Sequence, residues 1–120
     1  MAKKTKVIEY LSIPYTHSDP FVRAYRFEVA NKIAAALMLE GRIILSPISM
    51  SHPMSVYGLP GDWDFWQDYD EAYVKASGKI LVVKLEGWKK SVGVKAEIKL
   101  AKKYKIPVSY IDPKKYLNGH

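Results

Sequence analysis

The chain has 120 residues, of which 48% are hydrophobic and 26% are charged, and its net charge is +7. This length and composition predict one globular domain. The lack of cysteine excludes a disulfide framework and thiolate chemistry, and no apolar run is long enough to cross a bilayer, so we expect a cytoplasmic protein that does not bind membranes. The positive charge suits nucleic acid or a small phosphorylated substrate, although solvated helix faces are often equally rich in lysine.

The apolar pattern predicts strands and helices that alternate along the chain. Strands are expected at residues 6–13, 42–45, 79–85 and 107–111. Helices are expected from residue 20 to about residue 40, and at 63–77 and 91–104. Prolines and glycines at residues 46–62 predict a long loop, whose apolar side chains favour an ordered lid or wall. Residues 1–5 and 113–120 are expected to be a basic N-terminal tail and a C-terminal tail.

This alternation predicts the α/β fold class. Successive strands joined by helices pair in parallel through right-handed crossovers, which gives a small, mostly parallel, doubly wound sheet. Ligands of such sheets bind in the crevice at the carboxyl ends of the strands. A site is therefore expected in the loops that follow the strands.

Two carboxylates occupy helix positions where apolar side chains are expected. Glu97 lies in the middle of the apolar face of the helix at 91–104, and Asp70 lies inside the aromatic face of the helix at 63–77. An ionised carboxylate that faces a core costs several kcal/mol unless it is hydrogen-bonded or its pKa rises, and such groups cluster at functional sites. Two structural interpretations stay open: the helix dipole or an arginine stabilises Glu97, and a buried donor satisfies Asp70.

Further polar and aromatic residues are predicted at the same edge of the sheet. Ser91 and Gly93 begin the helix that carries Glu97, where backbone N–H groups and a hydroxyl suit a phosphate or a sugar oxygen. The loops after the first two strands bring other candidates within reach: Tyr10, Tyr15, His17, Ser46 and His52. His17 and His52 are each more typical of loop residues than of catalysts. The histidines show no spacing typical of a metal site, and P-loop, dinucleotide-binding and nucleophile-elbow motifs are absent.

Several segments occur in the order found in a known superfamily. They are residues 10–15 (YLSIPY), residues 45–48 (LSPI), Asp70 and residues 91–97 (SVGVKAE). The chain resembles the nucleoside 2-deoxyribosyltransferase superfamily, which includes 2'-deoxynucleoside 5'-phosphate N-hydrolases. It is most similar to a branch of small members with Y-L-x-x-P-Y in the first strand and a later G-W-x-x-S-x-G-V-x-x-E. The resemblance extends over about residues 6–112.

The resemblance implies a Rossmann-like three-layer fold and assigns roles to individual residues. Glu97 matches the nucleophile, and Asp70 matches an aspartate that engages the base or the sugar. Tyr10 matches the first-strand aromatic, and Ser91 matches the serine on the phosphate side. The sequence departs from the usual small or glycine residues of the superfamily at Ile13, Lys95 and Lys99.

These observations lead to a first hypothesis, cleavage or transfer at the N-glycosidic bond of a 2'-deoxynucleoside or its 5'-monophosphate. The Glu97 carboxylate would attack C1' to form a glycosyl-enzyme, and Asp70 would protonate or orient the base. Tyr10, Tyr15 or Trp66 could stack on the base. No cofactor or metal is expected, and we expect a homodimer or homotetramer. The alternatives are a non-catalytic module that binds nucleotides or nucleic acid, the latter a less favoured partner, and a structural partner protein.

Overall fold

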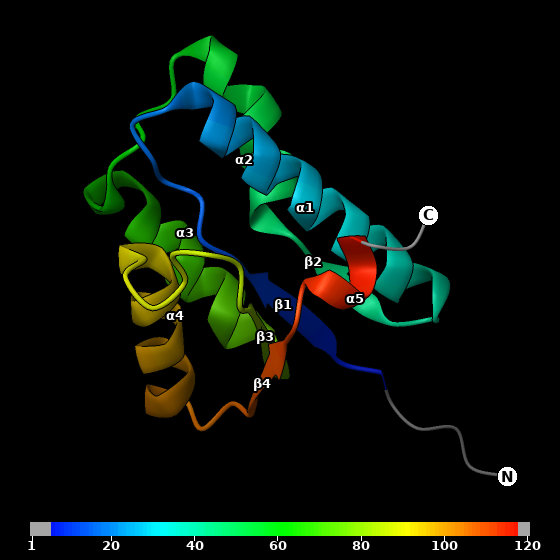
Figure 1. Ribbon diagram of the computed structural model, residues 1–120. Coiled ribbons are helices and arrows are strands. Elements are labelled where there is room, and N and C mark those ends of the chain that lie inside the picture. Colours follow the sequence, from blue (N-terminus) through cyan, green and yellow to red (C-terminus); the bar gives the residue numbers. More distant parts are fainter. Residues whose placement is uncertain (1–5, 118–120) are drawn as a thin grey trace, which may run out of the picture.

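Four parallel strands form the centre of the computed structural model, which describes residues 6–117 (Figure 1). The strands are β1 (Ile8–Ser12), β2 (Ile43–Leu45), β3 (Lys79–Val83) and β4 (Val108–Ile111). Their order in the sheet is β2-β1-β3-β4, so the chain reverses its direction of winding beside β1. The predicted α/β class with a small parallel sheet is confirmed, and the layers are those of a Rossmann-like fold.

Helices cover both faces of this sheet. They are α1 (Pro20–Leu39), α2 (Pro47–Met54), the 3-10 turn η1 (Ser55–Tyr57), α3 (Trp63–Ala76), α4 (Val92–Lys103) and α5 (Lys114–Leu117). The predicted first turn of α1 is confirmed, because the Asp19 side chain accepts a hydrogen bond from the N–H of Phe21 at 2.9 Å. Within residues 6–117, none of the helices combines the length and the apolar character that a membrane crossing requires.

Alternating side chains of the strands form a separate core on each face of the sheet. Leu11 and Leu81 point toward α1, where they pack with Val29, Ile33 and Leu37. The neighbours of these leucines along the strands point toward α3 and α4, where Tyr10, Ile80 and Val82 pack with Val74, Val94 and Ala101. Because successive strand residues face opposite sides, Tyr10 and Ser12 both face the helix that carries Glu97.

Two segments that were predicted to lack helices are helical in the structure. Residues 46–62 are not one long loop, because Pro47 occupies the first turn of α2, where its missing N–H costs nothing, and Ile48 packs against the core beneath α1. The predicted C-terminal tail contains α5, whose Tyr116 and Leu117 pack on the same core. The predicted tail at residues 1–5 and the last part of the other tail, residues 118–120, lie outside the described residues.

The loops that follow β1 and β3 are held together by one arginine of α1. Arg26 donates hydrogen bonds of 3.2 Å to the carbonyl oxygens of Thr16 and Glu86, one from each loop. Gly87 permits this close approach, since its φ is 93° and a Cβ there would lie 2.9 Å from Nη2 of Arg26. Arg26 therefore fixes both loops at the carboxyl edge of the sheet, where the cavity described next opens.

Candidate active site

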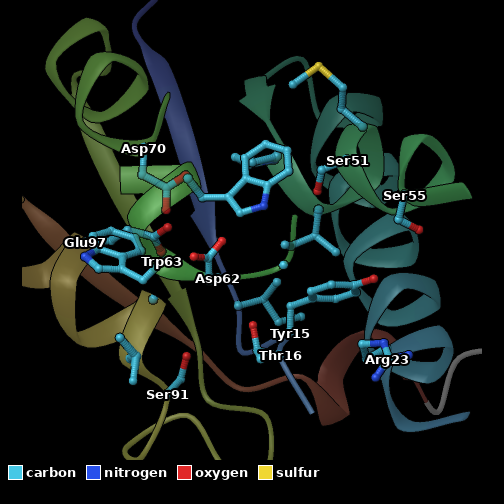
Figure 2. Close-up of a pocket in the computed structure, with 18 of the residues that line it drawn as sticks. Tyr15, Thr16, Arg23, Ser51, Ser55, Asp62, Trp63, Asp70, Ser91 and Glu97 are labelled. Atoms are coloured by element: carbon cyan, nitrogen blue, oxygen red, sulfur yellow. The ribbon is translucent and has the colours of Figure 1, made fainter. Parts of the chain in front are cut away.

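A cavity of about 720 Å³ opens at the carboxyl end of β1, between α1 and α2 on one side and α3 and α4 on the other (Figure 2). Its volume is typical of sites that enclose a small molecule. Its position matches the crevice that a doubly wound sheet forms where the winding reverses. The cavity is therefore the candidate site of this fold.

Glu97 lies at the wall of this cavity and is held by two hydroxyl groups of β1. Its side chain is almost enclosed, with 7% of the residue exposed. The Tyr10 hydroxyl donates to Oε2 at 2.6 Å, and the Ser12 hydroxyl donates to Oε1 at 2.6 Å. Both carboxylate oxygens are thus fixed in orientation by a rigid central strand, which is the arrangement expected of a positioned reactive group.

Asp70 and Glu97 form a coupled pair of acids. Burial raises the pKa of Glu97 well above its ordinary value of 4.5, and the neighbouring Asp70 carboxyl adds to this rise. Burial also raises the pKa of Asp70, against the opposing effect of hydrogen bonding with Glu97 and Tyr10. Figure 2 shows the two carboxyl groups directed toward the same part of the cavity. Both carboxyl groups therefore hold a proton more tightly than free carboxyl groups do.

The first turn of α4 offers polar groups beside Glu97. The Ser91 hydroxyl oxygen accepts a hydrogen bond from the N–H of Val94 at 3.2 Å, which caps the helix and leaves the hydroxyl hydrogen able to donate to a ligand. A Cβ on Gly93 would meet nothing nearer than the Ser91 hydroxyl at 3.9 Å. The fold itself does not require glycine at this position, but a bound ligand would gain room from it.

Aromatic side chains from α3 form a second wall of the cavity. Trp63, Trp66 and Tyr73 line it, and the indole N–H of Trp66 donates to the carbonyl oxygen of Pro60 at 2.7 Å. Tyr15 lines the same cavity from the loop after β1. A planar ring could therefore lie against aromatic surfaces in this part of the site.

The family described as "Domain of unknown function (DUF1937)" matches residues 7–112, which is nearly the whole chain. The chain belongs to the DUF1937 family. No curated protein matches it. In residues 6–117 of this DUF1937 domain, no group of three or more His, Asp or Glu side chains is placed to hold a metal ion.

Most of the predicted site residues meet in the cavity of the DUF1937 domain. They are Tyr10, Tyr15, Trp66, Asp70, Ser91, Gly93 and Glu97. His17, also considered from the sequence, lines the cavity as well. Residues that lie two or more elements apart along the chain are thus brought to one edge of the sheet, as the predicted topology required.

Two predicted residues lie outside this cavity. Ser46 precedes α2, and its hydroxyl hydrogen-bonds that of Ser49 at 2.7 Å, because the helix that begins at Pro47 turns this segment toward α1. His52 lies behind the cavity wall, where its Nδ1 is 2.5 Å from the Tyr15 hydroxyl and its ring stacks on Phe27 at 4.3 Å between centroids. His52 therefore supports Tyr15 and does not itself line the site.

The sequence interpretation also missed residues that line the cavity or support it. Ser12 holds Glu97, and its position two residues after Tyr10 on the same strand is a signal that could have found it. Asp62 precedes α3 but makes no capping hydrogen bond with its side chain, and it lines the cavity instead. Arg23 of α1 also lines the cavity, together with Thr16 and Ser51. An arginine in the first turns of a helix gives no such signal, because arginines at such positions are equally common on surfaces that face solvent.

Proposed function

We propose that the protein cleaves or transfers at the N-glycosidic bond of a 2'-deoxynucleoside or its 5'-monophosphate through a covalent bond between C1' and Glu97. The observation that carries the proposal is the Glu97 carboxyl, which is buried at the cavity wall and held through both oxygens by Tyr10 and Ser12. The resemblance to nucleoside 2-deoxyribosyltransferases supports the same assignment. Retaining chemistry at an anomeric carbon needs one nucleophilic carboxylate and one group that assists departure of the base.

In the first step an oxygen of ionised Glu97 attacks C1' while the bond from C1' to the base nitrogen breaks. The base leaves with the electron pair of that bond and takes a proton from Asp70. This step needs Asp70 protonated and Glu97 ionised. The hydrogen bonds from Tyr10 and Ser12 favour the ionised form of Glu97, against burial and Asp70, which raise its pKa.

In the second step a water molecule attacks C1', and the C1'–Oε bond breaks to return the Glu97 carboxylate. The ionised Asp70 takes the proton of that water, so the pair regains its starting state. The products of hydrolysis are the free base and a deoxyribose or its 5-phosphate. A second base in place of water would make the reaction a transfer, with Asp70 accepting its N–H proton.

The start of α4 is proposed to face the 5' side of the sugar. Ser91 can donate a hydrogen bond, Lys90 adds a positive charge, and both line the same cavity as Glu97. A phosphate on the 5' oxygen would be stabilised there by the hydroxyl and by the amino-terminal end of the helix. This arrangement predicts a preference for 5'-monophosphates over nucleosides.

Base release from a panel of substrates tests the proposal. The wild-type protein and the Glu97→Gln variant are incubated with deoxynucleosides, their 5'-monophosphates and the matching ribonucleotides, and free base is measured by chromatography. The wild type should release base from at least one deoxy substrate, and the variant should not. Binding of nucleotides with no base release by the wild type would instead support the non-catalytic module, to which the charge of +7 is also suited.

We also propose a homodimer or homotetramer. Large apolar side chains stay exposed at the ends of α1 and in η1, among them Phe21 at 84%, Val56 at 79% and Tyr57 at 85%. A second copy that covers such side chains would gain free energy from their burial. Light scattering at micromolar concentration tests this, and a 13.7 kDa monomer that still releases base would refute it.

A further inference from the structure

Arg23 places a positive charge at the side of the cavity opposite the two acids. In Figure 2 its guanidinium extends from α1 on one side, whereas Asp70 and Glu97 lie on the other. Arg23 is half-buried and lines the cavity. The side of the cavity opposite the two acids therefore carries a positive charge of its own, separate from that of Lys90 beside Ser91.

The charge of Arg23 is not balanced by a carboxylate within residues 6–117. Arg42, by contrast, pairs with Glu9 at 2.6 Å. Arg23 donates through Nη1 to the carbonyl oxygen of His17, which ties the loop after β1 to α1. A guanidinium carries five N–H donors in a planar fork, so most of its donors stay available to a ligand.

Hydroxyl groups of three residues line the same cavity as this guanidinium. They belong to Tyr15, Thr16 and Ser51, and Figure 2 shows Tyr15 nearest to Arg23, Thr16 nearer the middle of the cavity and Ser51 farther away, on α2. Arg23 lies close enough to Tyr15 to oppose the rise that burial causes in the phenol pKa. Tyr15 is in turn fixed by His52 behind it. A guanidinium beside the fixed Tyr15 hydroxyl, with two further hydroxyls in the cavity, is a donor set suited to the oxygens of a phosphate.

We propose that Arg23 and these hydroxyls bind a second phosphate of the substrate, separate from a 5'-phosphate beside Ser91. This inference rests on the proposed function for the nucleotide itself. With C1' at Glu97, a phosphate on the 5' oxygen falls near the start of α4, whereas Arg23 is reached only across the cavity. The second phosphate is either a 3'-phosphate or the terminal phosphate of a 5'-polyphosphate.

Calorimetric titration in the Glu97→Gln background, where turnover is blocked, tests this subsite. The ligands are one deoxynucleoside as its 5'-monophosphate, its 5'-diphosphate and its 3',5'-bisphosphate. One of the doubly phosphorylated ligands should bind at least about tenfold more tightly than the monophosphate, as charge-assisted hydrogen bonds allow, and the ligand that gains identifies the source. Arg23→Gln should abolish that gain and leave the monophosphate affinity within about twofold.

Lys32→Gln is the matched control, since Lys32 is an exposed cation of the same helix outside the cavity, and it should retain the gain. If Arg23→Gln fails to fold, Arg23→Lys keeps the charge without the planar fork and should lose part of the gain. The subsite would be overturned if Arg23→Gln lowered the affinity for all three ligands equally. It would also be overturned if a second phosphate gave no gain in affinity in the Glu97→Gln protein. A gain in affinity that depends on Arg23, with no base release by the wild type, would reject the proposed chemistry and keep the subsite. Base release with no gain in affinity from a second phosphate would keep the chemistry and reject the subsite.

Discussion

Replacement of Glu97 by Gln should stabilise the protein, and increasingly so as the pH rises. Burial and Asp70 raise the pKa of Glu97 above 4.5, so the folded chain binds this proton more tightly than the unfolded chain. Below pH 4.5 the Glu97 carboxyl is protonated in both the folded and the unfolded chain, so its ionisation does not change the free energy of unfolding. Above it the unfolded chain ionises first, and the free energy of unfolding falls until the pH reaches the pKa of the folded state.

The size of this effect follows from the same linkage. Each unit by which folding raises the pKa lowers the wild-type free energy of unfolding at high pH by about 1.4 kcal/mol. The Gln amide cannot ionise, so the variant does not bear this cost. Gln keeps the size of the side chain, and one of the two hydroxyls that hold Glu97 can turn to accept from the new amide N–H.

Urea unfolding from about pH 4 to about pH 8 measures the difference between Glu97→Gln and wild type. We expect it to grow with pH by up to about 1.4 kcal/mol per unit above pH 4.5, while base release falls at least about 10³-fold. Glu28→Gln, at an exposed position of α1, removes the same formal charge outside the cavity and is the control. A difference between Glu97→Gln and wild type that does not change with pH would refute the argument that Glu97 is a desolvated, coupled acid.

Three further variants test other parts of the structure. Gly93→Ala should keep or raise the melting temperature, since a Cβ has space there and Ala favours a helix by up to about 1 kcal/mol. The same variant should lower kcat/KM, because the methyl group would occupy space that the ligand needs. Ser91→Asp should keep the melting temperature, because Asp can also accept the hydrogen bond from the N–H of Val94. The new negative charge should reverse any preference for 5'-monophosphates in competition assays. An unchanged preference would place the phosphate elsewhere. Arg42→Met should unfold at lower urea concentration than wild type above about pH 4.5, with little change in turnover. The hydrogen bond from Arg42 is the main cause that lowers the pKa of Glu9, and the stabilisation that it gives is lost as the pH falls. An equal loss of stability at low pH would contradict this argument.

The fold was largely predictable because its signals are local. Apolar runs separated by amphipathic segments predicted every strand and the helices α1, α3 and α4, and the parallel order followed from the alternation. The helices that were missed, α2 and α5, are short and depend on tertiary contacts. Ile48 and Leu117 stabilise them by packing on the core under α1, and no local pattern of residues announces that packing.

The acids of the site were predictable because they break a pattern, whereas its other members do not. Glu97 and Asp70 interrupt apolar helix faces, and such an interruption has a free-energy cost that sequence alone reveals. Ser12 on a buried strand and Arg23 near the start of a helix carry no comparable cost, and only the spacing of Ser12 from Tyr10 on the same strand offers a weaker signal. The prolines of residues 46–62 predict a loop, whereas α2 begins at Pro47 and turns Ser46 away from the cavity.

The net charge of +7 has a different meaning once the cavity is known. The lysines on the outer face of α4, such as Lys95 and Lys99, are exposed and do not line the cavity, and Lys103 lies 3.6 Å from Glu71. They add to a long-range field that attracts anions and is screened by salt, but they cannot distinguish one anion from another. Discrimination needs fixed donors at short range. The donors proposed for that role are Arg23 and Ser91, which line the cavity together with the two acids.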